Sequence, residues 1–149
     1  ALYESATSRY EKKDYDGALA AYNDILKAEP ANEEAKIEMA MTAVERGDVK
    51  AAREVLTKAA ADTSASRDIF YSLGEVTLAA HDVDEATRWF EKAASADPYW
   101  AKPLLRLGEA AMQKGDGASA ARLLARAVEV DPTAPEAATA KAALESLKK

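Results

Sequence analysis

Residues of similar size and character recur every 34 positions along this chain of 149 residues. One series keeps alanine and another keeps aspartate: Ala18, Ala52, Ala86 and Ala120, and Asp14, Asp48, Asp82 and Asp116. Two further series keep side-chain size, one large and one small: Tyr22, Leu56, Phe90 and Leu124, and Ala6, Ala40, Gly74 and Gly108. Such a period predicts a chain built from similar units that stack on one another.

The stretch from 70 to 98 shows what each unit is. Its first half carries Phe70, Leu73 and Thr77 on one helical stripe, and its second half repeats the pattern from Ala86 to Ala93. The polar dipeptide His81-Asp82 separates the two halves and predicts a tight turn between two antiparallel helices. A hairpin this small cannot bury both apolar faces alone, so we expect neighbours of the same kind on either side.

The period and the residue types resemble the tetratricopeptide repeat family. The match is closest at Leu73-Gly74 and Leu107-Gly108, each followed by the alanine and large-residue positions of the period. The resemblance implies an all-α fold, a right-handed α-solenoid of antiparallel helix pairs with about nine helices. We expect a single array over 1–149, with units at about 1–32, 33–66, 67–100 and 101–134 and a capping helix at about 135–147. In that last helix Ala138, Ala142 and Ala143 lie on one side.

The turn of each unit has its own signature. The periodic aspartates stand just before the second helix of each pair, where a carboxylate can accept hydrogen bonds from free backbone N–H groups. The residues before them are expected in the left-handed conformation that ends the first helix. These residues are Lys13, Gly47, His81 and Gly115.

Composition excludes several classes of function. The 26 acidic and 20 basic residues give a net charge of −6, which argues against nucleic acid as the main partner. The chain has no cysteine and one histidine, so thiol catalysis, disulfides and His-pair metal sites are excluded. No glycine-rich phosphate loop occurs, and carboxylate pairs such as Glu33/Glu34 flank turns. We therefore expect no enzyme activity, no catalytic or metal-binding residues and no cofactor.

No apolar run is long enough to span a bilayer. We expect a soluble protein without direct membrane insertion. The sequence leaves the compartment open between cytoplasm and periplasm.

The resemblance also implies where a partner would bind. In the family the first helices of the pairs line a concave groove, and the groove-facing positions carry over to Tyr3, Thr7, Tyr10, Ile37, Met41, Val44, Tyr71, Glu75, Leu78, Leu105, Glu109 and Met112. Most of these residues are apolar. Glu34, Glu38 and Glu45 fall on or beside the same strip, and Lys102 and Arg106 form a basic pair near its far end.

An apolar groove with an acidic rim favours a protein or peptide partner that has apolar anchors and basic residues. The alternative interpretation of the strip is that these side chains pack against neighbouring helices instead of facing solvent.

Two hypotheses of function follow. The first is a protein-binding adaptor that holds a segment of another protein in its groove. The second is a structural module that forms a homo-oligomer or a larger complex through its N-terminal face or its convex surface, where Trp89, Tyr99 and Trp100 lie.

Overall fold

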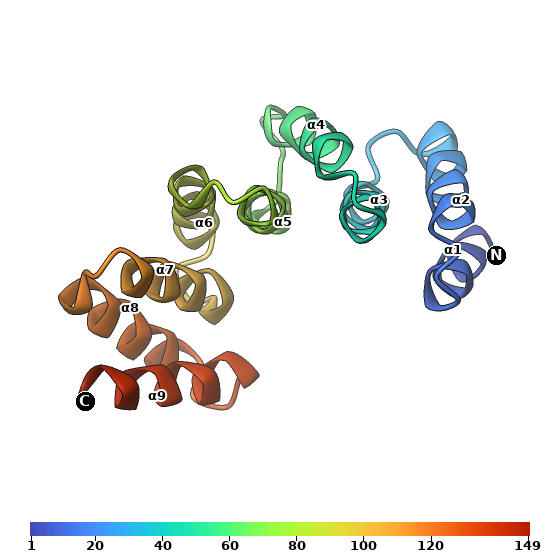
Figure 1. Ribbon diagram of the computed structural model, residues 1–149. Coiled ribbons are helices and arrows are strands. Elements are labelled where there is room, and N and C mark those ends of the chain that lie inside the picture. The colour runs from blue at the N-terminus through green and yellow to red at the C-terminus, as the bar shows by residue number, and fades with distance from the viewer. The chain divides into compact units, whose positions relative to one another are not determined.

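The computed structural model describes all residues 1–149 and contains nine helices and no strands (Figure 1). The helices are α1 Leu2–Glu11, α2 Tyr15–Ala28, α3 Glu33–Arg46, α4 Val49–Ala60, α5 Arg67–Ala79, α6 Val83–Ala96, α7 Ala101–Gln113, α8 Gly117–Val130 and α9 Pro135–Leu147. The predicted all-α class and helix number are confirmed, and the predicted bounds of the final helix agree with α9.

The chain forms two compact units, an N-terminal unit of Ala1–Asp82 and a C-terminal unit of Val83–Lys149. In the N-terminal unit each of the helices α1 to α4 packs on the next one, and α3 also contacts α5. In the C-terminal unit α7 packs on α6 and α8, and α9 packs on both α7 and α8. The expectation of a single domain over 1–149 stays a prediction.

The periodic positions form the core. All four periodic alanines are at most 1% exposed, and the four periodic large residues are at most 2% exposed. The small series is also buried, and in the N-terminal unit Ala6 lies in one core cluster with Ala18 and Tyr22. The 34-residue period therefore marks the positions where helices pack most closely.

The turn between the two helices of a pair follows the prediction. Lys13, Gly47, His81 and Gly115 have φ angles of 61°, 93°, 63° and 76°, all left-handed. In the first turn the Lys13 N–H donates to the Tyr10 carbonyl over 2.8 Å, and the Asp14 N–H donates to the Arg9 carbonyl over 2.9 Å. This pair of bonds is the Schellman motif, and all four turns have it.

The aspartate that follows the turn then begins the next helix. The Asp14 carboxylate accepts from the Gly17 N–H over 3.0 Å, and the Asp116 carboxylate accepts from the Ser119 N–H over 3.0 Å. Asp48 caps α4 in the same way. Hydrogen bonds from Ser119 hold the pKa of Asp116 below its usual value.

Successive repeats in the N-terminal unit are also joined by hydrogen bonds that the sequence did not predict. The Tyr3 hydroxyl donates to Asn32 Oδ1 over 2.9 Å, and Asn32 Oδ1 also accepts from the Ala35 N–H at the start of α3. One repeat later, Glu33 Oε2 accepts from both the N–H and the hydroxyl of Ser66, just before α5. Asn32 and Ser66 are 34 positions apart, so the period itself was the available signal.

The buried side of α9 differs from the expected one. Ala137 and Ala140 are buried, and Ala143, Leu144 and Leu147 are half-buried against the core of the C-terminal unit. Ala138 and Ala142 are exposed. The large side chains near the end of the helix fix this register, because burying Leu144 and Leu147 turns Ala138 and Ala142 outward.

We predict that Gly108→Ala destabilises the protein. A Cβ at Gly108 would lie 2.7 Å from Cγ and Cδ2 of Leu124, which is fully buried. The clash should cost about 1–3 kcal/mol, more than the roughly 1 kcal/mol that alanine gains over glycine inside a helix. Thermal unfolding followed by circular dichroism should show a lower Tm. Gly117→Ala is the matched control, since its Cβ meets nothing within 4 Å and its Tm should not fall.

We also predict that Asp116 contributes to acid unfolding. Its lowered pKa means that its contribution is complete above the ordinary aspartate value of 3.8 and is lost as the pH falls below it. Asparagine can still cap the helix but does not titrate. Between about pH 5 and about pH 2, Asp116→Asn should therefore lose less Tm than the wild type. An identical loss of Tm in both proteins would show that the Asp116 charge is not stabilising.

Candidate functional site

The candidate site in the N-terminal unit lies on the first helices of its repeats, α1, α3 and α5. We define the A-helix strip as the expected groove residues of this unit, together with Glu38. Tyr10 is 37% exposed, and Thr7 and Glu38 are also exposed. The other members are half-buried: Tyr3, Ile37, Met41, Val44, Tyr71, Glu75 and Leu78. The side chains of the strip are therefore not sealed inside the core.

The strip brings aromatic rings close to carboxylates. The Tyr10 ring packs on Tyr15 with 5.8 Å between ring centroids. Loss of hydration raises the pKa of the Tyr10 hydroxyl, and the negative charges of Glu45 and Glu38 raise it further. The pKa of Tyr3 is raised in the same way, by lost hydration and then by Glu34. The tyrosines of α1 and the glutamates of α3 therefore share one negative environment.

Glu38 lies at the centre of this environment. Although the residue is exposed as a whole, neighbouring side chains partly desolvate its carboxyl group, and this raises its pKa. The charge of Glu34, one turn earlier on α3, raises it further. Glu38 also raises the pKa values of Tyr3, Tyr10 and Tyr22, which places its charge close to all three.

Three carboxylates on α3, one in the strip and two beside it, have no cationic partner. Glu34, Glu38 and Glu45 form no ion pair. Other acidic residues of the same unit do: Asp14 pairs with Arg9 over 3.0 Å and Asp16 with Arg46 over 2.9 Å. These three negative charges, which lie beside half-buried apolar side chains, are thus not neutralised by an ion pair.

Tyr3 differs from the rest of the strip because its side chain already makes contacts within the folded chain. Its ring meets Tyr22 edge-on at 6.4 Å, and its hydroxyl donates to Asn32. These contacts hold α1 against α2 and against the start of α3. Tyr3 therefore positions the surface and offers a partner only the part of its ring that stays exposed.

The C-terminal unit carries the remaining expected residues on α7. Lys102 is exposed, while the Arg106 guanidinium donates to Glu109 Oε2 over 3.1 Å, one turn away. Met112 is half-buried against the core. The expectation for Leu105 is wrong: it is 7% exposed and lies in the core with Leu124 and Ala140, because α9 packs on this part of α7.

Comparison with known proteins decides the family. The family model described as tetratricopeptide repeat matches residues 9–70 and 77–144, which is most of the chain. The chain belongs to the tetratricopeptide repeat family. No curated protein sequence matches it significantly.

Solved structures of other tetratricopeptide repeat proteins share this fold. A crystal structure of MamA is 26% identical and has a TM-score of 0.71, with 85% of this chain and 74% of that chain covered. The protein TTC0263 of Thermus thermophilus is 22% identical, with a TM-score of 0.75 and coverage of 99% and 81%. The type III secretion chaperone SycD of Yersinia enterocolitica, solved with a peptide of the translocator YopD, is 23% identical, with a TM-score of 0.70 and coverage of 77% and 91%. The expected α-solenoid of antiparallel helix pairs is confirmed.

None of the helices of this tetratricopeptide repeat protein is both long enough and apolar enough to cross a lipid bilayer. The structure also contains no group of three or more His, Cys, Asp or Glu side chains arranged to hold a metal ion.

We predict that Glu38 titrates above the ordinary glutamate value of 4.5. Carbon-detected NMR titration of the side-chain carboxyl groups should give a raised pKa for Glu38. Glu34→Gln removes one negative charge and should lower the pKa of Glu38 only part of the way, because lost hydration is the larger cause. If Glu38 titrates at the ordinary glutamate value of 4.5, its carboxyl group is fully hydrated and the proposed environment is wrong.

Proposed function

We propose that this protein is a non-enzymatic scaffold that binds a peptide or a segment of another protein on the A-helix strip. We further propose that the bound segment carries apolar anchors and basic residues. The observation that carries the proposal is the row of unpaired carboxylates on α3, Glu34, Glu38 and Glu45, beside half-buried apolar side chains.

The apolar part of the argument rests on α3 and α5. Ile37 and Met41 follow one another by one turn along α3, and Tyr71 and Leu78 lie on α5, which contacts α3. All four side chains are half-buried, so each keeps area that a partner can remove from water. Methionine adapts its shape to different apolar anchors, which suits a surface that accepts a segment of variable sequence.

The charge part of the argument concerns orientation and selection. Uncompensated carboxylates attract lysine and arginine side chains and repel acidic segments, so they determine which segments approach and in what register. A partner cation would also stabilise the ionised form of Glu38, whose charge is unfavourable in the free protein.

Similar proteins support the class of function. The Yersinia chaperone SycD, which shares this fold, was solved in complex with a peptide of YopD. From SycD we extend to this chain only the class of ligand, which is a peptide. On α7 we keep Lys102, Arg106, Glu109 and Met112 as further candidate contacts, with the Arg106 charge partly balanced by Glu109.

We put binding ahead of assembly because the aromatic residues expected at an assembly surface have partners within the chain. The Trp89 Nε1–H donates to Glu85 over 3.3 Å, and the Lys92 ammonium lies 5.4 Å from the Trp89 ring centroid. The Arg126 guanidinium likewise lies 5.8 Å from the centroid of the Tyr99 ring, although Tyr99 remains 73% exposed.

A random peptide library displayed on phage tests the proposal. We expect the immobilised protein to enrich peptides that combine basic and large apolar residues, with binding that weakens as salt rises. For an enriched peptide, Glu38→Gln with Glu45→Gln should weaken binding by about tenfold, which is about 1.4 kcal/mol.

The matched control is Glu54→Gln with Glu91→Gln, which makes the same change of charge on exposed positions of α4 and α6. Its binding should stay within about twofold of the wild type. Equal weakening in both double variants, or enrichment of acidic peptides, would reject the A-helix strip as the binding surface.

A further inference from the structure

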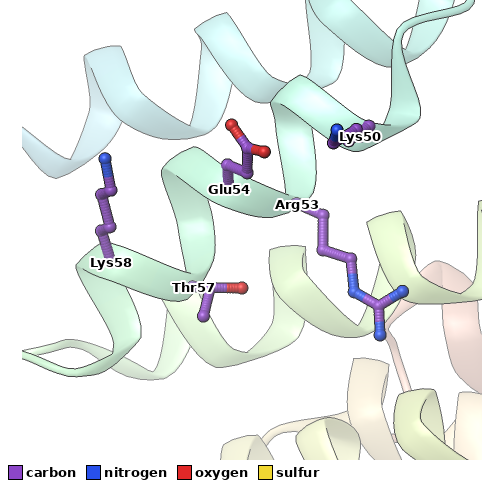
Figure 2. A pocket seen from close by; sticks show the side chains of 5 residues that line it. All are labelled: Lys50, Arg53, Glu54, Thr57 and Lys58. Atoms are coloured by element: carbon purple, nitrogen blue, oxygen red, sulfur yellow. The ribbon is translucent and has the colours of Figure 1, made fainter.

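The outward side of α4 carries a second surface of opposite charge. The inward side of this helix buries Ala52, Leu56 and Ala59 in the core. The residues on the other side recur at spacings of three and four and form one stripe. We call this stripe the α4 outer face; Figure 2 shows its members, Lys50, Arg53, Glu54, Thr57 and Lys58.

These five residues line a shallow, open depression of about 400 Å³. The methylene chains of the lysines and the methyl group of Thr57 give the depression an apolar wall, while the charged ends reach toward water. In Figure 2 the side chains of Lys50, Glu54 and Lys58 follow one another along α4, whereas the Arg53 side chain extends in another direction. Arg53 lies 3.9 Å from the carboxylate of Asp82.

Two lysines of the α4 outer face carry positive charges that no ion pair neutralises. Lys50 and Lys58 form no ion pair, unlike Lys27 with Asp24 or Lys114 with Asp84. They are eight residues apart on one helix, which separates their Cα atoms by about 12 Å along the axis. A protein with a net charge of −6 thus presents two unpaired cations on either side of a partly apolar depression.

We propose that the α4 outer face is a second docking surface, which binds an acidic segment of a partner protein. Two carboxylates of that segment, about two helical turns apart, would pair with Lys50 and Lys58, and an apolar side chain between them would enter the depression. This surface lies on other residues than the A-helix strip and selects the opposite charge, so the inference does not rest on the proposed function.

The depression favours a protein segment over a nucleic acid. Glu54 lies between the two lysines and repels a continuous row of phosphates, whereas separated carboxylates can avoid it. The apolar wall offers nothing to a phosphate backbone but can hold an aliphatic side chain.

The test uses a defined probe, a synthetic helical peptide with two glutamates two turns apart and a leucine between them. Proton–nitrogen chemical-shift mapping on the full chain should place the largest changes on the amides of 49–60. Lys50→Glu with Lys58→Glu should weaken binding at least tenfold, and a probe with lysines in place of the glutamates should not shift these amides.

The matched control is Lys141→Glu with Lys149→Glu, which changes the net charge equally at exposed positions of the C-terminal unit and should alter affinity by no more than about twofold. Circular dichroism checks that both double variants keep their helicity.

Three results would overturn the proposal. The first is an equal loss of affinity in the two double variants, which would mean attraction by net charge alone. The second is tighter binding of a short DNA duplex than of the peptide to the same amides. The third is a shift of these amides with protein concentration in the absence of peptide, which would assign the surface to a second copy of the chain.

Discussion

The close approach of two helices at one small residue is the contact on which this structure depends. In the C-terminal unit Gly108 of α7 lies so near Leu124 of α8 that no Cβ fits between them. The N-terminal unit has the corresponding pair, Ala6 of α1 and Tyr22 of α2, in one core cluster. Tyr22 occupies the same position in its repeat as Leu124. Small side chains on the first helix therefore receive large ones from the second, which fixes the rotation of both helices about their axes.

That fixed rotation decides which residues a repeat can offer to other molecules. With Ala40 and Ala43 buried, α3 turns Ile37, Met41 and its unpaired glutamates outward. With Ala52 and Leu56 buried, α4 turns Lys50 and Lys58 outward. A single repeat thus displays negative charge from its first helix and positive charge from its second, with the packed alanines between them. The partners that we propose for the two surfaces have opposite charge and would not compete for the same side chains.

Local rules explain what was predictable from the sequence. The left-handed turn residues, the aspartate caps and the buried periodic positions each depend on neighbours within a few residues or on a spacing visible in the chain. The expectation for Leu105 was wrong because its burial depends on α9, about thirty-five residues away, and the 34-residue period does not show which side chains of α7 that helix covers. The raised pKa of Glu38 depends first on how far its carboxyl group is desolvated in the folded chain, which the spacing of residues does not show. The α4 outer face did have a sequence signal, since Lys50, Arg53 and Lys58 share one helical face, but it lies outside the groove positions that the family resemblance singles out.

The turns after α1 and α5 show how a repeat can diverge and still fold. Lys13 and His81 adopt the same left-handed backbone as Gly47 and Gly115, and the Schellman hydrogen bonds are the same in all four turns. Lysine and histidine incur a steric penalty there that glycine avoids. The geometry is therefore imposed by the flanking helices and is not selected by the turn residue alone. The same turn geometry thus accepts glycine, lysine and histidine, whereas at Gly108 even one added methyl group would collide with Leu124.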